Sequence, residues 1–192
     1  SGGWGTDNVK QISGGNTHGT RLWLKSEIAS ENPAYVLAPQ IPRPQLWGAP
    51  DSEELAPYAE VLVELINQIK SELLIDENRI YIMGQSLGGI GVWDIIAKRP
   101  DIFAAGVPVC GAGNTDRIVN ARNIALWAFH GAMDTTVPVA GSRNMVTSLE
   151  AAKGNIRYTE YPDVGHNSWE RAFADPGLSQ WLFSNVRGQS QK

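Results

Sequence analysis

Short apolar runs alternate with amphipathic segments along most of the chain, and this alternation restricts the possible folds more than any other feature of the sequence. The runs are rich in residues that suit a pleated surface, and most of them predict buried strands. They are AYVLAP at 34–39, RIYIMG at 79–84, AAGVPVC at 104–110, IALWAFHG at 124–131 and IRYTEY at 156–161. Apolar periodicity predicts helices at 53–70, 89–98, 142–152 and 177–185.

The repeated order of strand and helix predicts an α/β fold, in which a mostly parallel central sheet has helices on both faces. Consecutive parallel strands need a crossover connection that is long enough to hold a helix. A chain of 192 residues with 42% apolar residues can bury one sizeable core, so we expect a single domain over residues 1–192. Ligands of such sheets bind at the carboxyl ends of the strands, so functional residues are expected directly after each apolar run.

Charge and cysteine content exclude several classes of partner. The net charge is -4 and the chain has only 16 basic residues, so it lacks a broad basic surface and nucleic acid is not an expected partner. No apolar run approaches the roughly 18 residues of a membrane-spanning helix, so no membrane association is expected. Cys110 is the only cysteine, which excludes an internal disulfide, and we expect it to be a small buried side chain. The 20 glycines and seven tryptophans suit a secreted hydrolase; nothing indicates the oligomeric state.

Residues 84–88, GQSLG, match the pattern G-x-S-x-G in a strand–turn–helix context. The predicted strand RIYIM precedes Ser86, and a predicted helix follows it at once. A sharp turn of this kind strains the serine backbone and lifts its hydroxyl above the sheet edge, and the flanking glycines allow the segments to approach closely. We therefore predict that Ser86 is a nucleophile and that the amide of Leu87, at the helix start, is an oxyanion donor.

A serine nucleophile needs a general base, and the chain has three histidines: His18, His130 and His166. In such folds the order of the triad along the chain is nucleophile, acid, histidine. His166 follows the last predicted strand and leaves room for an acid between itself and Ser86, whereas His18 lies early in a loop rich in Gly and Asn. His166 is the favoured base, and His130 at the end of a strand is the alternative.

Asp134 is the favoured acid because it comes directly after the strand IALWAFHG, at the carboxyl edge where it can reach an imidazole. Asp163 is an alternative, but it lies three residues from His166 on the same loop and is typical of a turn. Asp116, in the loop after the preceding strand, is a third candidate. We expect His130, four residues before Asp134, to steady that loop by a hydrogen bond.

With these residues in place, the chain resembles the α/β-hydrolase superfamily, and within it the group of predicted peptidases, feruloyl esterases and polyhydroxybutyrate-depolymerase-like esterases. The resemblance covers most of the chain and is carried by GTDNVKQI at 5–12, YVLAPQIP at 35–42, DENRIYIMGQSLGGIGVWDIIAKRPDIFAAGVPVCG at 76–111, WAFHGAMDTTVPV at 127–139 and YTEYPDVGHNSWERAF at 158–173. It implies an α/β-hydrolase fold and places the family's nucleophile, acid and base on Ser86, Asp134 and His166.

The resemblance also implies an oxyanion loop, which the sequence SGGWG at 1–5 matches. Family members have a central strand that ends in His-Gly directly before this loop, and the chain begins at Ser1 without it. We therefore expect that residues precede Ser1, that the N-terminal strands lie there, and that the chain is the C-terminal part of a longer polypeptide. The amide of Gly2, or of Ser1, is the expected second oxyanion donor, and a flexible glycine-rich terminus is the alternative.

Three tryptophans are candidates for a substrate-binding rim, because a flat amphipathic ring can hold an aryl or sugar group. Trp4 lies in the supposed oxyanion loop, Trp47 lies in PQIPRPQLWGAP, and Trp169 comes three residues after the proposed base. A packing role is the alternative for each. Gln85 could contact substrate or satisfy a nearby backbone group. The other tryptophans fall within predicted elements and are expected in the core: Trp23, Trp93, Trp127 and Trp181.

Together these features predict a serine carboxylesterase that acts through an acyl-enzyme and needs no metal or cofactor. The resemblance implies short-chain, aryl or feruloyl esters as substrates, either as small molecules or attached to a polysaccharide. No insertion of about 30 residues separates the strands to form a lid, which favours an open site. A serine peptidase or a polyester depolymerase could use the same triad, and a binding module that keeps the fold without turnover is a further alternative.

Overall fold

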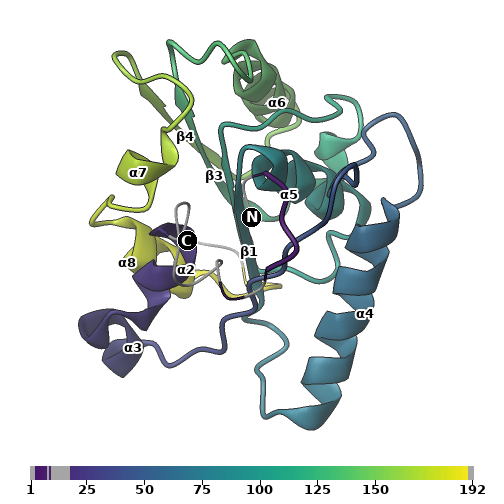
Figure 1. The fold of residues 1–192 in the computed structure, drawn as a ribbon, viewed down its shortest axis with the longest axis vertical. Coiled ribbons are helices and arrows are strands. Elements are labelled where there is room, and N and C mark those ends of the chain that lie inside the picture. Colours follow the sequence, from purple (N-terminus) through teal and green to yellow (C-terminus); the bar gives the residue numbers. More distant parts are fainter. Residues whose placement is uncertain (1–2, 8, 10–17, 190–192) are drawn as a thin grey trace.

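A computed structural model describes residues 3–7, 9 and 18–189 of the chain. In this part of the chain, four parallel strands form one sheet in the order β1-β2-β3-β4 (Figure 1). The strands are β1 (Tyr81–Gln85), β2 (Ala105–Val109), β3 (Ala125–Gly131) and β4 (Ile156–Tyr161). The helices are α2 (His18–Arg21), α3 (Ser26–Glu31), α4 (Pro57–Glu72), α5 (Leu87–Lys98), α6 (Ala140–Ala151), α7 (Trp169–Ala172) and α8 (Leu178–Ser184), with 3-10 turns η1 (Leu22–Leu24) and η2 (Ile118–Ala121).

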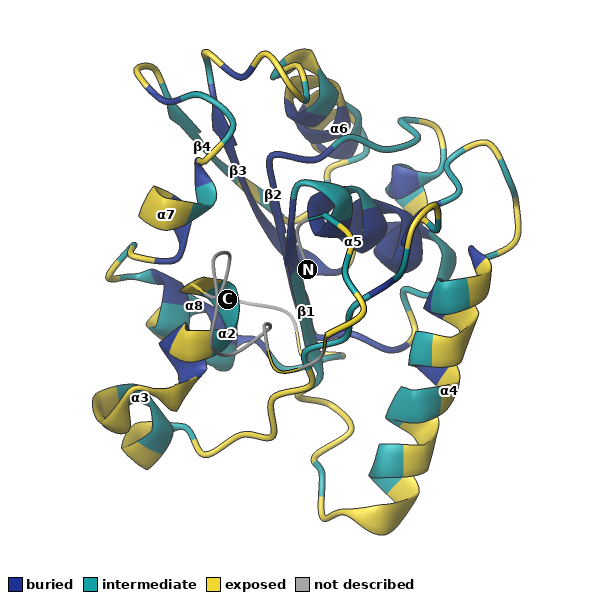
Figure 2. Cartoon of the chain, in the orientation of Figure 1, coloured by how far each residue is buried: buried dark blue, intermediate teal, exposed yellow. Residues whose placement is uncertain are grey.

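Helices cover both faces of the sheet, and the side chains of β3 show why. Successive residues of a strand point to opposite faces. Leu126 and Ala128 belong to the core on the side of α4, α5 and α6, whereas Trp127 and Phe129 belong to the core on the side of η1, α7 and α8. All four are buried, and Figure 2 shows β3 buried along its length. A strand that is apolar on both sides needs cover on both sides, so the predicted α/β arrangement is confirmed.

Four of the five predicted strands and all four predicted helices are confirmed, with ends that shift by a few residues. The helix predicted from residue 53 begins instead at Pro57, because proline suits the first turn of a helix, where its missing N–H is not needed. The short helices α2, α3 and α7 are too brief to give an apolar periodicity in the sequence. None of the described helices is long and apolar enough to cross a membrane.

The predicted strand at 34–39 is wrong. These residues are irregular, and Tyr35, Val36 and Leu37 are exposed. A strand forms where a neighbouring strand takes its backbone hydrogen bonds, and no described strand pairs with this segment. Within the described sheet, β1 pairs with β2 alone and is therefore an edge strand.

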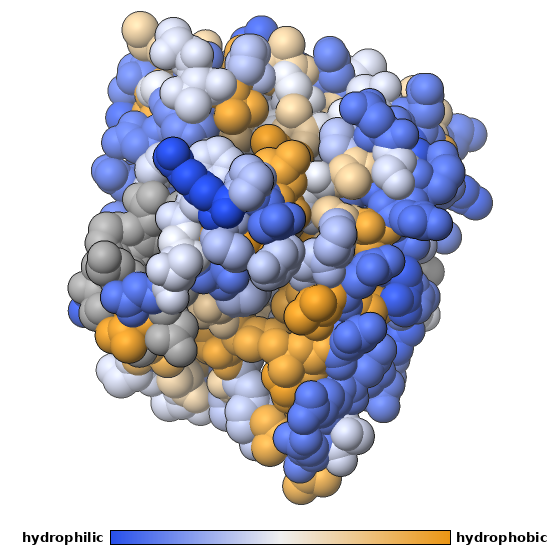
Figure 3. Space-filling view, turned by 45° about the vertical axis from the view of Figure 1, so that its right-hand side comes forward, coloured by the Kyte–Doolittle hydropathy of each residue, from blue (hydrophilic) through white to orange (hydrophobic). Residues whose placement is uncertain are grey.

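Figure 3 shows apolar side chains gathered across the lower half of one face of the molecule.

Tryptophan side chains pack in the cores on both sides of the sheet. Trp23, Trp93 and Trp127 are buried. Trp181 is partly buried, and its ring meets that of Trp127 edge to face at a centroid distance of 5.3 Å. The core role that the sequence predicts for these four residues is confirmed.

A buried ion pair within α5 anchors the segment before α4 to this helix. Lys98 Nζ lies 2.8 Å from Asp94 Oδ2, and both side chains are almost completely buried. Lys98 also donates to the carbonyl oxygens of Ala49 and Glu54, and the Asp94 carboxylate accepts a hydrogen bond from the Ala49 amide. The pair therefore holds the loop that carries Trp47 against α5.

Candidate active site

Ser86 lies in the turn between β1 and α5, where the sequence predicts it. Its backbone has φ 54° and ψ −118°, a conformation that residues with a side chain rarely adopt. A Cβ on Gly84 would lie 2.2 Å from the carbonyl oxygen of Gly88, and one on Gly89 would lie 2.3 Å from that of Val109. Glycine at these positions therefore allows β1, α5 and β2 to approach closely, and the turn holds the serine hydroxyl at the carboxyl edge of the sheet.

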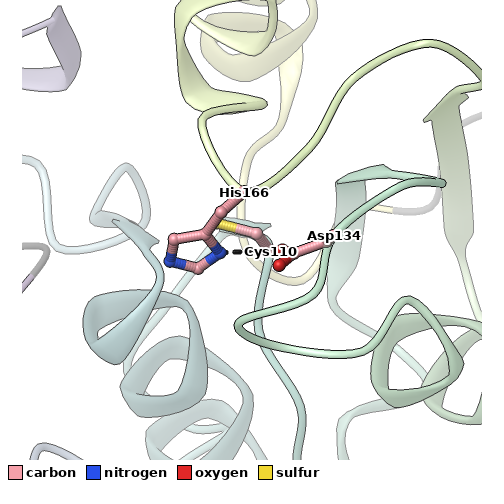
Figure 4. Close-up of side chains that lie close together, drawn as sticks. All are labelled: Cys110, Asp134 and His166. Carbon is pink, nitrogen blue, oxygen red and sulfur yellow. Dashed lines mark hydrogen bonds and ion pairs between the residues drawn. The ribbon is translucent and has the colours of Figure 1, made fainter.

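The Ser86 hydroxyl belongs to a hydrogen-bonded relay of three side chains. Its Oγ lies 2.9 Å from His166 Nε2, and His166 Nδ1 lies 2.8 Å from Asp134 Oδ2. Figure 4 shows the side chains of Asp134 and His166 pointing toward each other, joined by this second contact. In the tautomer that carries its proton on Nδ1, the ring donates a hydrogen bond to the Asp134 carboxylate. Nε2 then keeps a lone pair that can accept the serine proton. The arrangement can generate a nucleophile with a base and an orienting acid.

Asp134 and His166 come from the loops that follow neighbouring strands. Asp134 follows β3 and His166 follows β4, and because these strands are parallel, both loops leave the sheet at the same edge. The two loops are in close contact at Gly131, where a Cβ would lie 2.3 Å from the carbonyl oxygen of Val164. This contact brings the carboxylate within reach of the imidazole.

Hydrogen bonds fix the Asp134 carboxylate in its ionised form. Oδ1 accepts hydrogen bonds from the amides of Thr136 (2.8 Å) and Val137 (2.9 Å), and Oδ2 contacts His166. Burial raises the pKa of Asp134, but the hydrogen bonds from His166 and from the two amides outweigh burial, and the pKa is lowered. The ionised carboxylate therefore stabilises the fold above its ordinary pKa of about 4, and this stabilisation is lost as the pH falls through the lowered value.

The other two candidate acids do not contact His166. Asp163 is exposed and forms a two-bond ion pair with Arg171, at 2.8 and 2.7 Å. Asp116 is exposed in the loop after β2. Of the three carboxylates that the sequence leaves open, the structure brings Asp134 to the imidazole.

His130 holds the loop that carries Asp134. Its ring is completely buried, with Nδ1 2.7 Å from Ser142 Oγ. Nε2 lies 2.9 Å from the carbonyl oxygen of Val137 and 3.2 Å from Asp134 Oδ2. These contacts agree with the supporting role that the sequence favours for His130.

The amide of Leu87 has the geometry expected of an oxyanion donor. Leu87 is the first residue of α5, so its N–H has no acceptor within the helix and lies at the positive end of the helix dipole, next to Ser86. The second predicted donor, Gly2, falls outside the described residues. Of the described part of that loop, the amide of Gly5 donates to the carbonyl oxygen of Ile41 at 3.0 Å.

Two of the tryptophans predicted at the rim are at least partly accessible. Trp169 is partly buried, and its ring meets that of His166 edge to face at a centroid distance of 5.3 Å. Trp4 is 42% exposed, and its indole N–H donates to the carbonyl oxygen of Gln45 at 2.6 Å. The structure therefore places Trp169 directly against the proposed base and fixes Trp4 to the loop before α4.

Trp47 and Gln85 are buried. Trp47 is 5% exposed and packs against α5 at Gly91, where a Cβ would lie 2.4 Å from the Trp47 Cβ. Trp47 is therefore a packing residue, which is the alternative given for it above, and it does not lie at an exposed rim. Gln85 is 4% exposed at the end of β1, and among the described residues its Nε2 has no hydrogen-bond partner. Gln85 therefore places a buried side-chain amide directly before Ser86 in the sequence.

Cys110 is buried, as the sequence predicts, and it lies beside Ser86, a position that no pattern in the sequence indicates. Its Sγ accepts a hydrogen bond from the Ser86 amide at 3.3 Å, and its backbone φ is 42°. Burial raises the pKa of the Cys110 thiol to about 12, so the thiol is neutral at physiological pH. The pairing of the strands explains this contact. Gln85 pairs with Val109, so the residues that follow them, Ser86 and Cys110, leave the sheet side by side.

Comparison with solved structures connects this site to a known fold. A thermostable esterase is 33% identical in sequence, with a TM-score of 0.88, and the match covers 96% of this chain and 52% of the esterase chain. The chain has the α/β-hydrolase fold. A family model described as the prolyl oligopeptidase family matches residues 59–128 of the chain, a region that contains Ser86.

More distant structures share this fold. A variant of Arabidopsis thaliana SOBER1 is 17% identical with a TM-score of 0.66, and the match covers 94% of each chain. An acylaminoacyl peptidase from Pyrococcus horikoshii is 15% identical with a TM-score of 0.59, and the match covers 72% of this chain and 29% of the peptidase. No curated protein matches the chain. The chain spans about half the length of the thermostable esterase.

Proposed function

We propose that the chain hydrolyses carboxylic esters through an acyl-enzyme formed on Ser86. The observation that carries this proposal is the relay from Ser86 Oγ through His166, at 2.9 Å, to Asp134, at 2.8 Å. A serine hydroxyl alone is a weak nucleophile at neutral pH, and the two contacts supply a base and the group that orients it. The 33% identity to a thermostable esterase supports an ester as the substrate.

In the proposed mechanism, His166 Nε2 takes the hydroxyl proton while Ser86 Oγ attacks the ester carbonyl carbon. Asp134 holds the imidazole in the tautomer with a proton on Nδ1 and stabilises the imidazolium that forms. The Leu87 amide donates a hydrogen bond to the oxyanion of the tetrahedral intermediate. The imidazolium then gives its Nε2 proton to the leaving alcohol. Water, deprotonated by the same imidazole, attacks the acyl-enzyme, releases the acid and restores Ser86.

The choice of acid gives a direct test of this mechanism. Asp134→Asn is expected to lower kcat/KM for ester hydrolysis by about 10³- to 10⁴-fold, because an amide at this position no longer stabilises the imidazolium or selects the correct tautomer. Asp163→Asn is the matched control. Its ion pair with Arg171 is exposed, so its rate should stay within about twofold of the parent. Initial rates with p-nitrophenyl acetate give kcat/KM for both variants. If both variants lose the same share of kcat/KM, Asp134 is wrongly assigned as the acid that orients His166.

The proposed substrates are short-chain or aryl esters, including feruloyl esters. Trp169, against His166, and the exposed ring of Trp4 support an aryl-binding rim, because flat rings stack well on aryl or sugar groups. The His166 side chain is 22% exposed, so an ester attached to a polysaccharide has access to the proposed base. These features favour an ester whose bulk stays outside the site.

A serine peptidase is the second candidate, and the match to the prolyl oligopeptidase family model supports it. The same relay can attack an amide carbonyl, and the matched residues 59–128 contain the nucleophile turn. However, the matched region ends before Asp134 and His166, whereas the esterase match covers 96% of the chain. The ester is therefore the favoured substrate.

A panel of substrates separates these candidates: p-nitrophenyl acetate, ethyl ferulate and a chromogenic peptide. We expect a higher kcat/KM for the two esters than for the peptide, and the opposite order would make the protein a peptidase. A fluorophosphonate probe tests whether the site is reactive at all. Labelling at Ser86 is expected, and an unlabelled folded protein would indicate a binding module without turnover.

A further inference from the structure

Cys110, Asp134 and His166 form a compact set of metal-binding side chains beside the proposed nucleophile. One atom from each residue, a thiol sulfur, a carboxylate oxygen and a ring nitrogen, lies within 4.8 Å of the other two. Figure 4 shows the three side chains converging from separate loops. Cys110 and Asp134 are buried, and the His166 side chain is 22% exposed. We infer that a thiophilic divalent cation such as Zn²⁺ binds these three side chains and inhibits the enzyme.

The set of donor atoms suits zinc. Zn²⁺ takes sulfur, nitrogen and oxygen ligands at about 2.0–2.3 Å in a tetrahedron, which places neighbouring ligand atoms roughly 3.3–3.7 Å apart. The three ligand atoms lie within 4.8 Å of one another, and His166 Nδ1 lies 2.8 Å from Asp134 Oδ2. Cation binding must therefore draw the wider pairs together and move this close pair apart, in each case by about 1 Å or less. A water molecule on the solvent side of His166 completes the tetrahedron.

The charges of the site also suit a divalent cation. Coordination displaces the thiol proton to solvent, so the bound cation faces one thiolate and the Asp134 carboxylate. Two negative ligands balance the two positive charges of the cation. The complex therefore buries no uncompensated charge.

Inhibition follows from the tautomer of His166, and this step rests on the proposed function. A cation bound between His166 Nδ1 and Asp134 takes the place of the proton that joins them at 2.8 Å. The displaced ring proton then resides on Nε2, which donates to Ser86 Oγ and can no longer accept its proton. Ser86 has no general base while the cation remains. A chelator that removes the cation restores the original tautomer and the activity.

Absorption of Co²⁺, which binds zinc sites, tests cation binding without any substrate. A thiolate ligand gives cobalt a sulfur-to-metal charge-transfer band. We expect this band in the parent protein and in Ser86→Ala, which keeps all three ligands, and we expect its loss in Cys110→Ala. A parent protein that shows no such band at saturating Co²⁺ overturns the proposal, even if Cys110→Ala fails to fold. A protein that shows the band but hydrolyses no ester contradicts the proposed function and leaves the cation site supported.

Inhibition by Zn²⁺ tests the consequence for ester hydrolysis, with each variant compared with its own uninhibited rate. The Zn²⁺ concentration for half-inhibition should rise at least about tenfold in Cys110→Ala. Removing a residue that only supports a metal ligand already lowers metal affinity by about this factor, and Cys110 is proposed to bind the metal directly. Asp163→Asn removes an exposed carboxylate from the loop of His166 and should leave the zinc sensitivity unchanged. Mg²⁺, which prefers oxygen ligands, should not inhibit. Equal zinc sensitivity of the parent and Cys110→Ala overturns the proposal.

Discussion

Replacing Ser86 with alanine is expected to lower kcat/KM for p-nitrophenyl acetate by about 10⁵-fold or more, without loss of stability. The Ser86 hydroxyl forms the covalent bond to the acyl group, so its removal prevents the acyl-enzyme from forming. The backbone at this position has φ 54°, and alanine, like serine, carries a Cβ there, so the strain of the turn is unchanged. Initial rates and melting temperatures of the two proteins measure both parts of the prediction.

Ser71→Ala is the matched control for the loss of a serine hydroxyl. Ser71 is exposed on α4, and its Oγ donates to the carbonyl oxygen of Gln68. Alanine is favourable in a helix, so this variant should keep both the activity and the melting temperature of the parent. The acyl-enzyme mechanism is refuted if Ser86→Ala hydrolyses the ester at the parental rate.

Most of the fold could be predicted because the central strands are buried on both faces. β2 and β3 are buried along their whole length, and a strand in such a position is a continuous apolar run in the sequence. Residues 34–39 have the same apolar character but are irregular, and several are exposed. An apolar run shows that a segment is suited to a strand, whereas the strand itself also needs a neighbour to pair with. The run contains no information about that neighbour.

The relay could be predicted because a parallel sheet brings the loops that follow its strands to one edge. Ser86, Asp134 and His166 follow β1, β3 and β4, and this order alone places them together. The packing around the site could not be predicted in the same way. Trp47 is buried because it packs on Gly91, a residue on another element, and the contact of Cys110 with Ser86 depends on the strand register. Such contacts are set by the packed structure and leave no periodic signal.

Gly84→Ala is expected to destabilise the protein by about 3 kcal/mol or more, because the new methyl group would overlap backbone atoms that cannot move independently. The added Cβ would lie 2.2 Å from the carbonyl oxygen of Gly88, in the first turn of α5. Relief of this overlap must move β1 away from α5, which also moves Ser86 from His166. We therefore expect a large drop in the urea midpoint of unfolding, and loss of ester hydrolysis in the fraction that still folds.

Gly165→Ala shows whether this effect comes from the turn or from the loss of a glycine as such. A Cβ on Gly165 meets its nearest atom, the carbonyl oxygen of Met133, at 3.8 Å, which is an ordinary contact. The free energy of unfolding should therefore change by no more than about 1 kcal/mol, since alanine fits the site and also restricts the unfolded chain. If Gly84→Ala and Gly165→Ala have the same urea midpoint, the close approach of β1 and α5 does not govern the geometry of the nucleophile turn. A much lower midpoint for Gly84→Ala alone supports the view that this approach holds the Ser86 hydroxyl at the sheet edge.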